Sequence, residues 1–172
     1  MFELVQFQTI NQPEILAVGK LTRSDFQGRM PDGRHLSDLW GDCFNTGVFG
    51  TLEALVPHIH DPAYVGYMDG CDFAAGVMNY LCGMMMKPGV PVPDGFAAQK
   101  IAPAKIAVAW VKGPQDKVPE LCAAAHGITL DAMRQNGLKP IDGWVMEVYT
   151  NERFSTPDAN GDIIVDYYIP CE

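Results

Sequence analysis

The sequence predicts an α+β protein built from antiparallel strands and two main helices. The predicted elements follow the order strand, helix, strand, strand, and this order occurs twice along the 172 residues. Strands and helices do not alternate regularly, which disfavours a parallel sheet. The two halves also share a short motif, because Pro13-x-x-Leu-Ala-Val recurs as Pro103-x-x-Ile-Ala-Val at an offset of 90 residues. We therefore expect a single domain, residues 1–172, made of a duplicated strand–helix–strand–strand unit.

The first half of the repeat is predicted over about residues 1–87. A strand over 13–22 leads through a polar loop to a helix that starts near Leu36. Apolar residues then recur every three or four positions as far as Leu55, as on one face of a helix. Ser37 or Asp38 can cap its start, and Pro57 ends it. Two strands, 63–69 and 78–86, complete this half.

The second half is predicted over about residues 96–172, after a connector at 88–95 that is rich in proline and glycine. A strand follows Pro103, and a helix with one apolar face runs from Val118 to a C-terminal cap at Gly137. Two strands, 144–150 and 162–170, close the half. The same four elements are thus expected in the same order.

Composition excludes several classes of function. The 12 basic and 21 acidic residues give a net charge of −9, which argues against direct binding to nucleic acid. The N-terminus has no signal-peptide pattern, and no apolar run reaches the roughly 20 residues that span a membrane. The five cysteines include no C-x-x-C pair, which is typical of reduced thiols. These features predict a cytoplasmic protein without membrane contact.

A carboxylate in an apolar strand is the strongest candidate for a functional residue. The segment GWVMEVYT places Glu147 among Trp144, Val145, Met146 and Val148, without the alternation of a surface strand. Burying a carboxylate without a partner costs several kcal/mol. Either the protein supplies a partner for Glu147, or an external ligand does.

Aromatic side chains are candidates for the walls of a ligand site around Glu147. Tyr149 lies two positions away and therefore on the same strand face. Tyr167 and Tyr168 face opposite ways, and we choose Tyr167. Ordinary core packing is an equal alternative for the rings that come from the other elements: Trp40, Tyr67, Tyr80 and Trp110.

Several motifs, in order, resemble the GyrI-like small-molecule-binding domain. They are Tyr80-x-x-Gly83, VPDGF, KIAPAKIAVAWVKG, Glu147-x-Tyr149 and YYIP near the C-terminus. This domain is the effector-binding module of AraC-type and multidrug-responsive regulators such as Rob and BmrR. The resemblance implies two antiparallel sheets flanking a central cleft for hydrophobic, often cationic, ligands, with the family's acidic residue at Glu147.

The resemblance also sets the expected partners and the alternatives. Regulators of this family carry a separate DNA-binding domain, for which the sequence leaves no residues, so we expect a stand-alone sensor, for which a protein partner in transcription is one option. One alternative is a hydrolase of strained or activated electrophiles, with Glu147 as general acid or base and Tyr149 or Tyr80 as proton donor. A second is a protein–protein inhibitor that uses its acidic surface.

Metal binding and nucleophilic catalysis have little support in the sequence. His58-Ile-His60-Asp61 offers two histidines, but no third ligand stands at a recognisable spacing. The serines lack a nucleophile-elbow motif, and no glycine motif for phosphate is present. We therefore predict no catalytic nucleophile, no metal and no cofactor.

Overall fold

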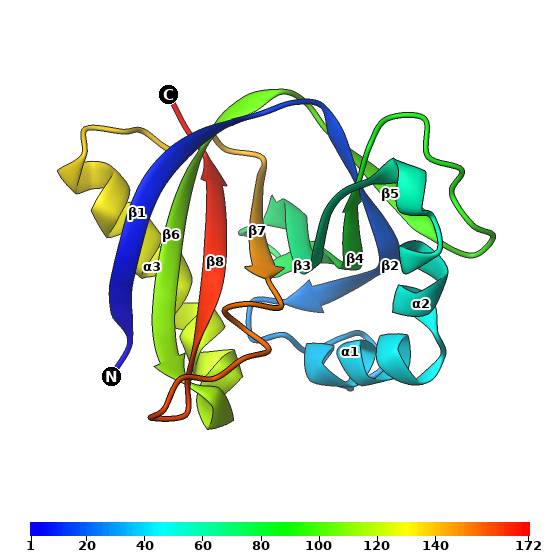
Figure 1. Cartoon of the computed structure of the whole chain (residues 1–172), viewed down its shortest axis with the longest axis horizontal. Helices are drawn as coiled ribbons and strands as arrows, with labels where there is room; N and C mark the ends of the chain where they lie inside the picture. The colour runs from blue at the N-terminus through cyan, green and yellow to red at the C-terminus, as the bar shows by residue number, and fades with distance from the viewer. The chain divides into compact units, whose positions relative to one another are not determined.

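The computed structural model describes all 172 residues as an α+β protein with antiparallel strands, as predicted. Its eight strands and three α-helices fall into two compact units (Figure 1). We call residues 1–13 together with 103–172 unit 1, and residues 14–102 unit 2. Each unit has its own antiparallel strands and its own helices, and each is described separately below.

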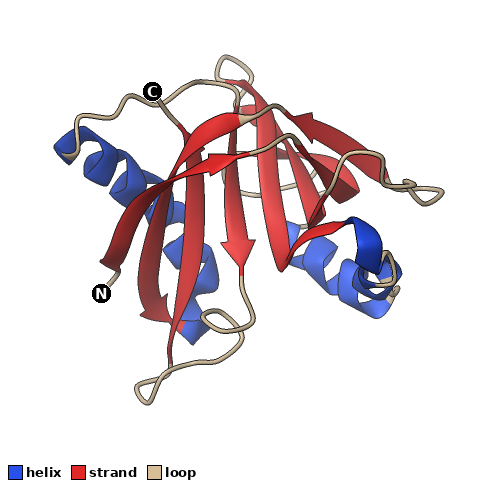
Figure 2. Ribbon diagram, turned by 45° about the horizontal axis from the view of Figure 1, so that its top comes forward, coloured by secondary structure: helices blue, strands red, loops and turns tan.

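Unit 2 contains four antiparallel strands in the order β3-β4-β2-β5. Two α-helices and a 3-10 turn lie between its first two strands in the chain (Figure 2). The bounds are β2 Ile15–Asp25, α1 Leu36–Asn45, α2 Val48–Glu53, η1 Val56–His58, β3 Ile59–Asp72, β4 Val77–Met86 and β5 Ala97–Ile101.

Unit 1 has the matching strand order β1-β6-β8-β7. Its long helix packs Leu121, Ala125 and Met133 against Ala109 and Val165 of the strands. Figure 1 shows this helix, α3, beside the strands of the unit. The helix ends before Gly137, whose φ of +69° lets the chain turn away, as the predicted cap requires. The bounds are β1 Glu3–Gln12, β6 Ala104–Pro114, η2 Gln115–Lys117, α3 Val118–Gln135, β7 Trp144–Tyr149 and β8 Asp162–Pro170.

The duplicated order of elements is present in both units. β2, α1 with α2, β3 and β4 in unit 2 correspond to β6, α3, β7 and β8 in unit 1. Each unit also has a fourth strand that the sequence analysis missed. β1 precedes β2 in the chain but pairs with β6, and β5 precedes β6 but pairs with β2. The first strand of each repeat, β1 or β5, thus pairs with a strand of the other repeat. That the chain is one domain with repeats at 1–87 and 96–172 stays a prediction.

The offset of 90 residues between the repeats does not hold at the level of side chains. Val18 pairs with Met84 of β4, and Met84 pairs with Tyr64 of β3, so the three side chains share one face. The Tyr64 ring stacks on Phe49 of α2, so this is the face that the helices cover. Val108, which stands 90 residues later, neighbours Ala109, and Ala109 packs in the core beneath α3. Adjacent residues of a strand point to opposite faces, so the offset pairs residues from opposite faces.

The single helix predicted from Leu36 to Leu55 is two helices in the structure. The chain turns at Gly47, whose φ of +76° lies in the left-handed region and interrupts the helix. The N-terminal cap is His35 and not Ser37 or Asp38. Asp38 instead accepts the backbone N–H of His35 at 2.9 Å and completes a capping box.

We expect a strong position dependence of alanine substitution at glycines. Gly19 and Gly83 lie directly opposite each other, and a Cβ on Gly83 would be 1.9 Å from the Val18 carbonyl oxygen. Gly83→Ala should therefore lower the free energy of unfolding by about 1 to 3 kcal/mol. Gly127→Ala in α3 should raise it by about 0.5 to 1 kcal/mol, because nothing lies within 4 Å of the added methyl group.

Urea denaturation of the two variants and the parent chain measures both changes. Equal effects of the two substitutions would contradict the close approach of β2 and β4.

Candidate functional site

Three of the predicted site residues lie on the same face of unit 1, the face that α3 covers. Glu147 in β7 is directly opposite Tyr167 in β8, and Tyr149 is two residues further along β7. Tyr167 is buried in the core beneath α3, whereas Tyr168 pairs with Val108 and points to the other face. Strand pairing thus brings the carboxylate and two phenol rings to one place.

Glu147 has a partner within the protein. The Tyr149 hydroxyl donates a hydrogen bond of 2.6 Å to Glu147 Oε2. The carboxylate is only 9% exposed, so the hydrogen bond offsets part of the cost of removing it from water. Of the two alternatives for Glu147, a partner within the protein is therefore present, because the same alternation that puts Tyr149 on this face also puts its hydroxyl within reach.

Helix α3 adds two side chains that the sequence analysis did not select. Cys122 Sγ lies 3.4 Å from the Tyr149 hydroxyl, and the His126 ring packs edge-on to Tyr167 at 5.6 Å between centroids. Their four-residue spacing, which puts both on one helix face, was the available signal. Phe154, from the loop after β7, packs against Tyr149 at 4.6 Å. We call Glu147 with these five neighbours the Glu147 cluster.

The two α3 side chains of the cluster carry no charge near pH 7. Burial raises the pKa of the Cys122 thiol well above its usual value, and the negative charge of Glu147 raises it further. Partial burial of the His126 imidazole lowers its pKa, so the ring is uncharged near pH 7. Neither α3 side chain therefore brings a charge of its own to the carboxylate.

Trp110 lies on the opposite face of unit 1 from Glu147. It is paired in register with Asp166, and the Arg153 guanidinium lies 4.2 Å from its ring centroid. Arg153 Nε also donates a 3.0 Å hydrogen bond to Asp166, whose side chain is almost fully buried. The structure therefore places Trp110 in an ion-pair assembly and does not bring it to Glu147.

The three predicted rings of unit 2 divide between the two faces of its strands. Trp40 donates a 2.9 Å hydrogen bond from Nε1 to the Tyr80 hydroxyl and stacks on Phe49. Tyr67 is opposite Leu81, which follows Tyr80 in β4, and neighbouring strand residues point to opposite faces. Tyr67 therefore lies on the other face from Tyr80. Burial raises the pKa of Tyr67 strongly. Their role as ligand-binding residues stays a prediction.

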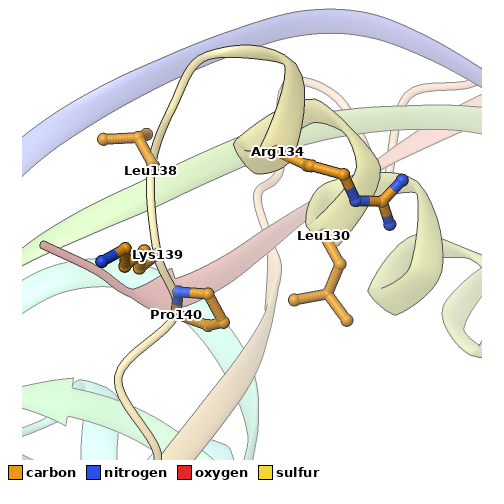
Figure 3. A pocket seen from close by; sticks show the side chains of 5 residues that line it. All are labelled: Leu130, Arg134, Leu138, Lys139 and Pro140. Atoms are coloured by element: carbon orange, nitrogen blue, oxygen red, sulfur yellow. The ribbon is translucent and has the colours of Figure 1, made fainter.

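Two surface hollows lie away from the predicted site residues. One, of about 250 Å³, is at the C-terminal end of α3 and is lined by Leu130, Arg134, Leu138, Lys139 and Pro140 (Figure 3). The other, of about 360 Å³, is in unit 2 beside α1 and β2. His58 and His60 belong to no group of three or more His, Cys, Asp or Glu side chains that could hold a metal ion. None of the helices is both long and apolar enough to cross a membrane.

Comparison with known sequences finds similarity to a transcriptional regulator. No protein-family model matches the chain. The transcriptional regulator BrlR of Pseudomonas aeruginosa is 32% identical over 112 residues, which is 64% of this chain and 39% of BrlR. The chain therefore matches well under half of the length of that relative.

Comparison with solved structures confirms the fold that the sequence motifs indicate. SAV2435 bound to tetraphenylphosphonium superposes with a TM-score of 0.67 at 15% identity, over 98% of this chain and 94% of that one. The C-terminal domain of EcmrR gives 0.59 at 16% identity, over 97% of both chains. A hydrolase from Listeria innocua gives 0.51 at 14% identity, over 97% of this chain and 92% of that one. The fold agrees with the one that the GyrI-like resemblance implies, and it is shared by SAV2435, the EcmrR C-terminal domain and a hydrolase.

The buried ion pair on the Trp110 face predicts a large cost for losing its cation. Arg153→Met leaves the 2% exposed Asp166 carboxylate without that cation, and should lower the free energy of unfolding by about 3 to 5 kcal/mol. Glu152→Gln is the matched control, because Glu152 is 88% exposed and 3.9 Å from Arg153, so its effect should stay within about 0.5 kcal/mol. Equal losses in urea denaturation would count against the ion pair.

The link between Glu147 and Cys122 predicts a change in thiol reactivity. Glu147→Gln removes a negative charge that raises the Cys122 pKa, so the thiolate fraction at pH 8 should increase. Alkylation of Cys122 by iodoacetamide should then be severalfold faster, as followed by peptide mass spectrometry. Cys71, an exposed residue of β3, should react at an unchanged rate. An unchanged rate at Cys122 would contradict the electrostatic link.

Proposed function

We propose that this chain is a small-molecule-binding domain of the effector type and that the Glu147 cluster binds hydrophobic aromatic cations. The observation that carries the proposal is the nearly buried Glu147 carboxylate, held by the Tyr149 hydroxyl among aromatic rings. The structural neighbour SAV2435, solved with the hydrophobic cation tetraphenylphosphonium, supports the choice of ligand class.

The electrostatics of the cluster favour a cation over a neutral ligand. A hydrogen bond from a phenol stabilises the ionised carboxylate without neutralising it. In a site that excludes most water, the attraction between this carboxylate and a cation is stronger than at the surface. A large cation with delocalised or shielded charge is weakly hydrated and loses little on entering such a site.

The surroundings of Glu147 favour aromatic and apolar groups on the ligand. The Tyr149 and Phe154 rings pack edge to face and are both half-buried, so each keeps some surface for contact. A cation beside such rings gains about 0.5 to 2 kcal/mol from each. His126 is neutral near pH 7, so it does not repel an approaching cation.

A role in transcription follows from the relatives and forms part of the proposal. BrlR is a transcriptional regulator, and the EcmrR domain shares the fold. With a net charge of −9, this chain is poorly suited to contact nucleic acid directly. We infer that ligand binding here is reported through a protein partner.

Tetraphenylphosphonium titration by isothermal calorimetry tests the ligand class. Glu147→Gln keeps the side-chain volume and removes the charge, and should weaken binding by about 2 to 5 kcal/mol. Glu152→Gln removes an equal charge from an exposed position and should change the affinity little. Neutral triphenylphosphine oxide should bind parent and Glu147→Gln chains alike. Equal weakening by the two substitutions would refute the assignment of Glu147.

A second candidate function, hydrolysis of strained electrophiles, is favoured by the 2.6 Å contact between the carboxylate and the phenol. Such a pair can move a proton, with Glu147 as general acid or base and Tyr149 as donor. Incubation with a styrene oxide series distinguishes the two functions. Hydrolysis predicts diol formation that Tyr149→Phe abolishes, whereas recovery of unchanged epoxide supports binding alone. Tyr80, the other predicted proton donor, accepts a hydrogen bond from Trp40 in unit 2.

The third alternative, a protein–protein inhibitor with an acidic surface, stays a prediction. Its test is a pull-down in which a captured partner is released as the salt concentration rises.

A further inference from the structure

A pair of buried thiols lies beside the hollow of unit 2, and the proposed ligand site does not use it. Cys43 of α1 is 1% exposed and lines the hollow of about 360 Å³. Cys82 of β4 is fully buried, and its thiol forms a hydrogen bond with the Cys43 thiol. Both cysteines are reduced. One thiol of this hydrogen-bonded pair, Cys43, therefore stands at the wall of the hollow, and Cys82 lies behind it.

The strand pairing explains why the two thiols meet. Cys82 lies two residues after Tyr80 in β4 and so points to the same face. Tyr80 contacts Trp40 of α1, so both β4 side chains face the helices. Cys43 lies three residues after Trp40, on the same side of α1, and so faces β4 one turn further along. The contact is thus set by the same packing that joins α1 to the strands.

The surroundings distinguish the chemical roles of the two sulfurs. The hydrogen bond from Cys82 lowers the pKa of the Cys43 thiol, and the positive charge of Lys20 acts in the same direction, against burial and the Asp42 carboxylate. Burial raises the pKa of Cys82 far above its usual value. Cys43 also lines the hollow whereas Cys82 does not, so Cys43 is the sulfur that an entering oxidant meets first.

Lys20 is held where its charge acts on the pair. It is directly opposite Cys82 in the β2–β4 ladder and also lines the hollow. Its Nζ donates a 2.7 Å hydrogen bond to the Gly95 carbonyl and lies 4.4 Å from the Phe96 ring centroid. These contacts fix a cation at the mouth of the hollow without neutralising it.

We propose that Cys43 is a site of oxidation by hydrogen peroxide and that Cys82 converts the product into an intramolecular disulfide. The Cys43 thiolate attacks one peroxide oxygen, the O–O bond breaks, and the departing hydroxide takes a proton to become water. Cys43 is then a sulfenic acid. The Cys82 sulfur attacks the Cys43 sulfur, the S–O bond breaks, and a second water leaves with the Cys82 proton. Two thiols and one peroxide thus give one disulfide and two waters.

The burial of Cys43 selects for a small oxidant. A residue that is 1% exposed is barely touched even by a water-sized molecule, and it excludes a bulky electrophile. Cys71, by contrast, is exposed, and partial removal from water together with the charge of Asp69 raises the pKa of its thiol. Cys71 is therefore accessible but weakly nucleophilic, which makes it an internal reference for the test.

The first experiment uses the unmodified chain and one equivalent of hydrogen peroxide at pH 7. Peptide mass spectrometry after alkylation should find Cys43 linked to Cys82, with the intact mass lowered by two hydrogens, while most Cys71 stays reduced. The proposal is overturned if Cys71 oxidises while Cys43 and Cys82 are both recovered as thiols. It is equally overturned if Cys43 is oxidised without ever linking to Cys82.

Variants at Cys82 separate the two steps. Cys82→Ser keeps a hydroxyl donor but cannot form the disulfide, so Cys43 sulfenic acid should accumulate and be trapped by dimedone. Cys82→Ala lacks the donor, and trapping at Cys43 should be severalfold slower. Circular dichroism confirms that both variants are folded before treatment. Equal trapping rates in the two folded variants would refute the role of the Cys82 hydrogen bond.

Discussion

The antiparallel pairing of β7 with β8 is the constraint from which the chemistry of unit 1 follows. It sets Glu147 directly opposite Tyr167 and so assigns the carboxylate to the face beneath α3. A shift of one residue would move Glu147 to the face that holds Asp166 and Arg153. It would also move the Tyr149 hydroxyl away from α3 and from Cys122. Register, more than any single contact, decides what the acid can do.

Each face of unit 1 holds a buried carboxylate, and the two carboxylates have partners of different kinds. Asp166 is held by two nitrogens of Arg153, which satisfies and neutralises it. Glu147 receives a hydrogen bond from a phenol, which satisfies an oxygen atom but adds no positive charge. The first arrangement is typical of structural stabilisation, and the second is the one that suits an exchangeable cation. The proposal names Glu147 as the ligand-binding carboxylate because the phenol that holds it carries no charge of its own.

Alternation along strands was the part of the site that the sequence could predict. Glu147 and Tyr149 share a face because they are two residues apart, and Tyr167 rather than Tyr168 joins them for the same reason. The contributions of α3 could not be predicted, because the contact of Cys122 with Tyr149 depends on how the helix crosses the strands. Trp110 was selected for its ring alone, without its register, and it lies on the other face.

The fold was predictable where periodicity was strong and not where pairing partners were remote. The order of helices and strands in both repeats follows from apolar spacing and from proline and glycine signals. β1 and β5 were missed because each pairs with a strand of the other repeat, which local pattern does not reveal. β5 is also short and contains two alanines, and β1 carries an irregularity between Leu4 and Gln6.

The crystal structure of the chain grown with tetraphenylphosphonium tests the central claim most directly. We predict the phosphonium ion on the face beneath α3, with an aryl group against the Tyr149 ring and the charge within about 6 Å of that ring's centroid and of the Glu147 carboxylate. The Tyr149 hydroxyl should still donate to Glu147. A phosphonium ion bound elsewhere, with the Glu147 cluster unchanged and unoccupied, would contradict the account.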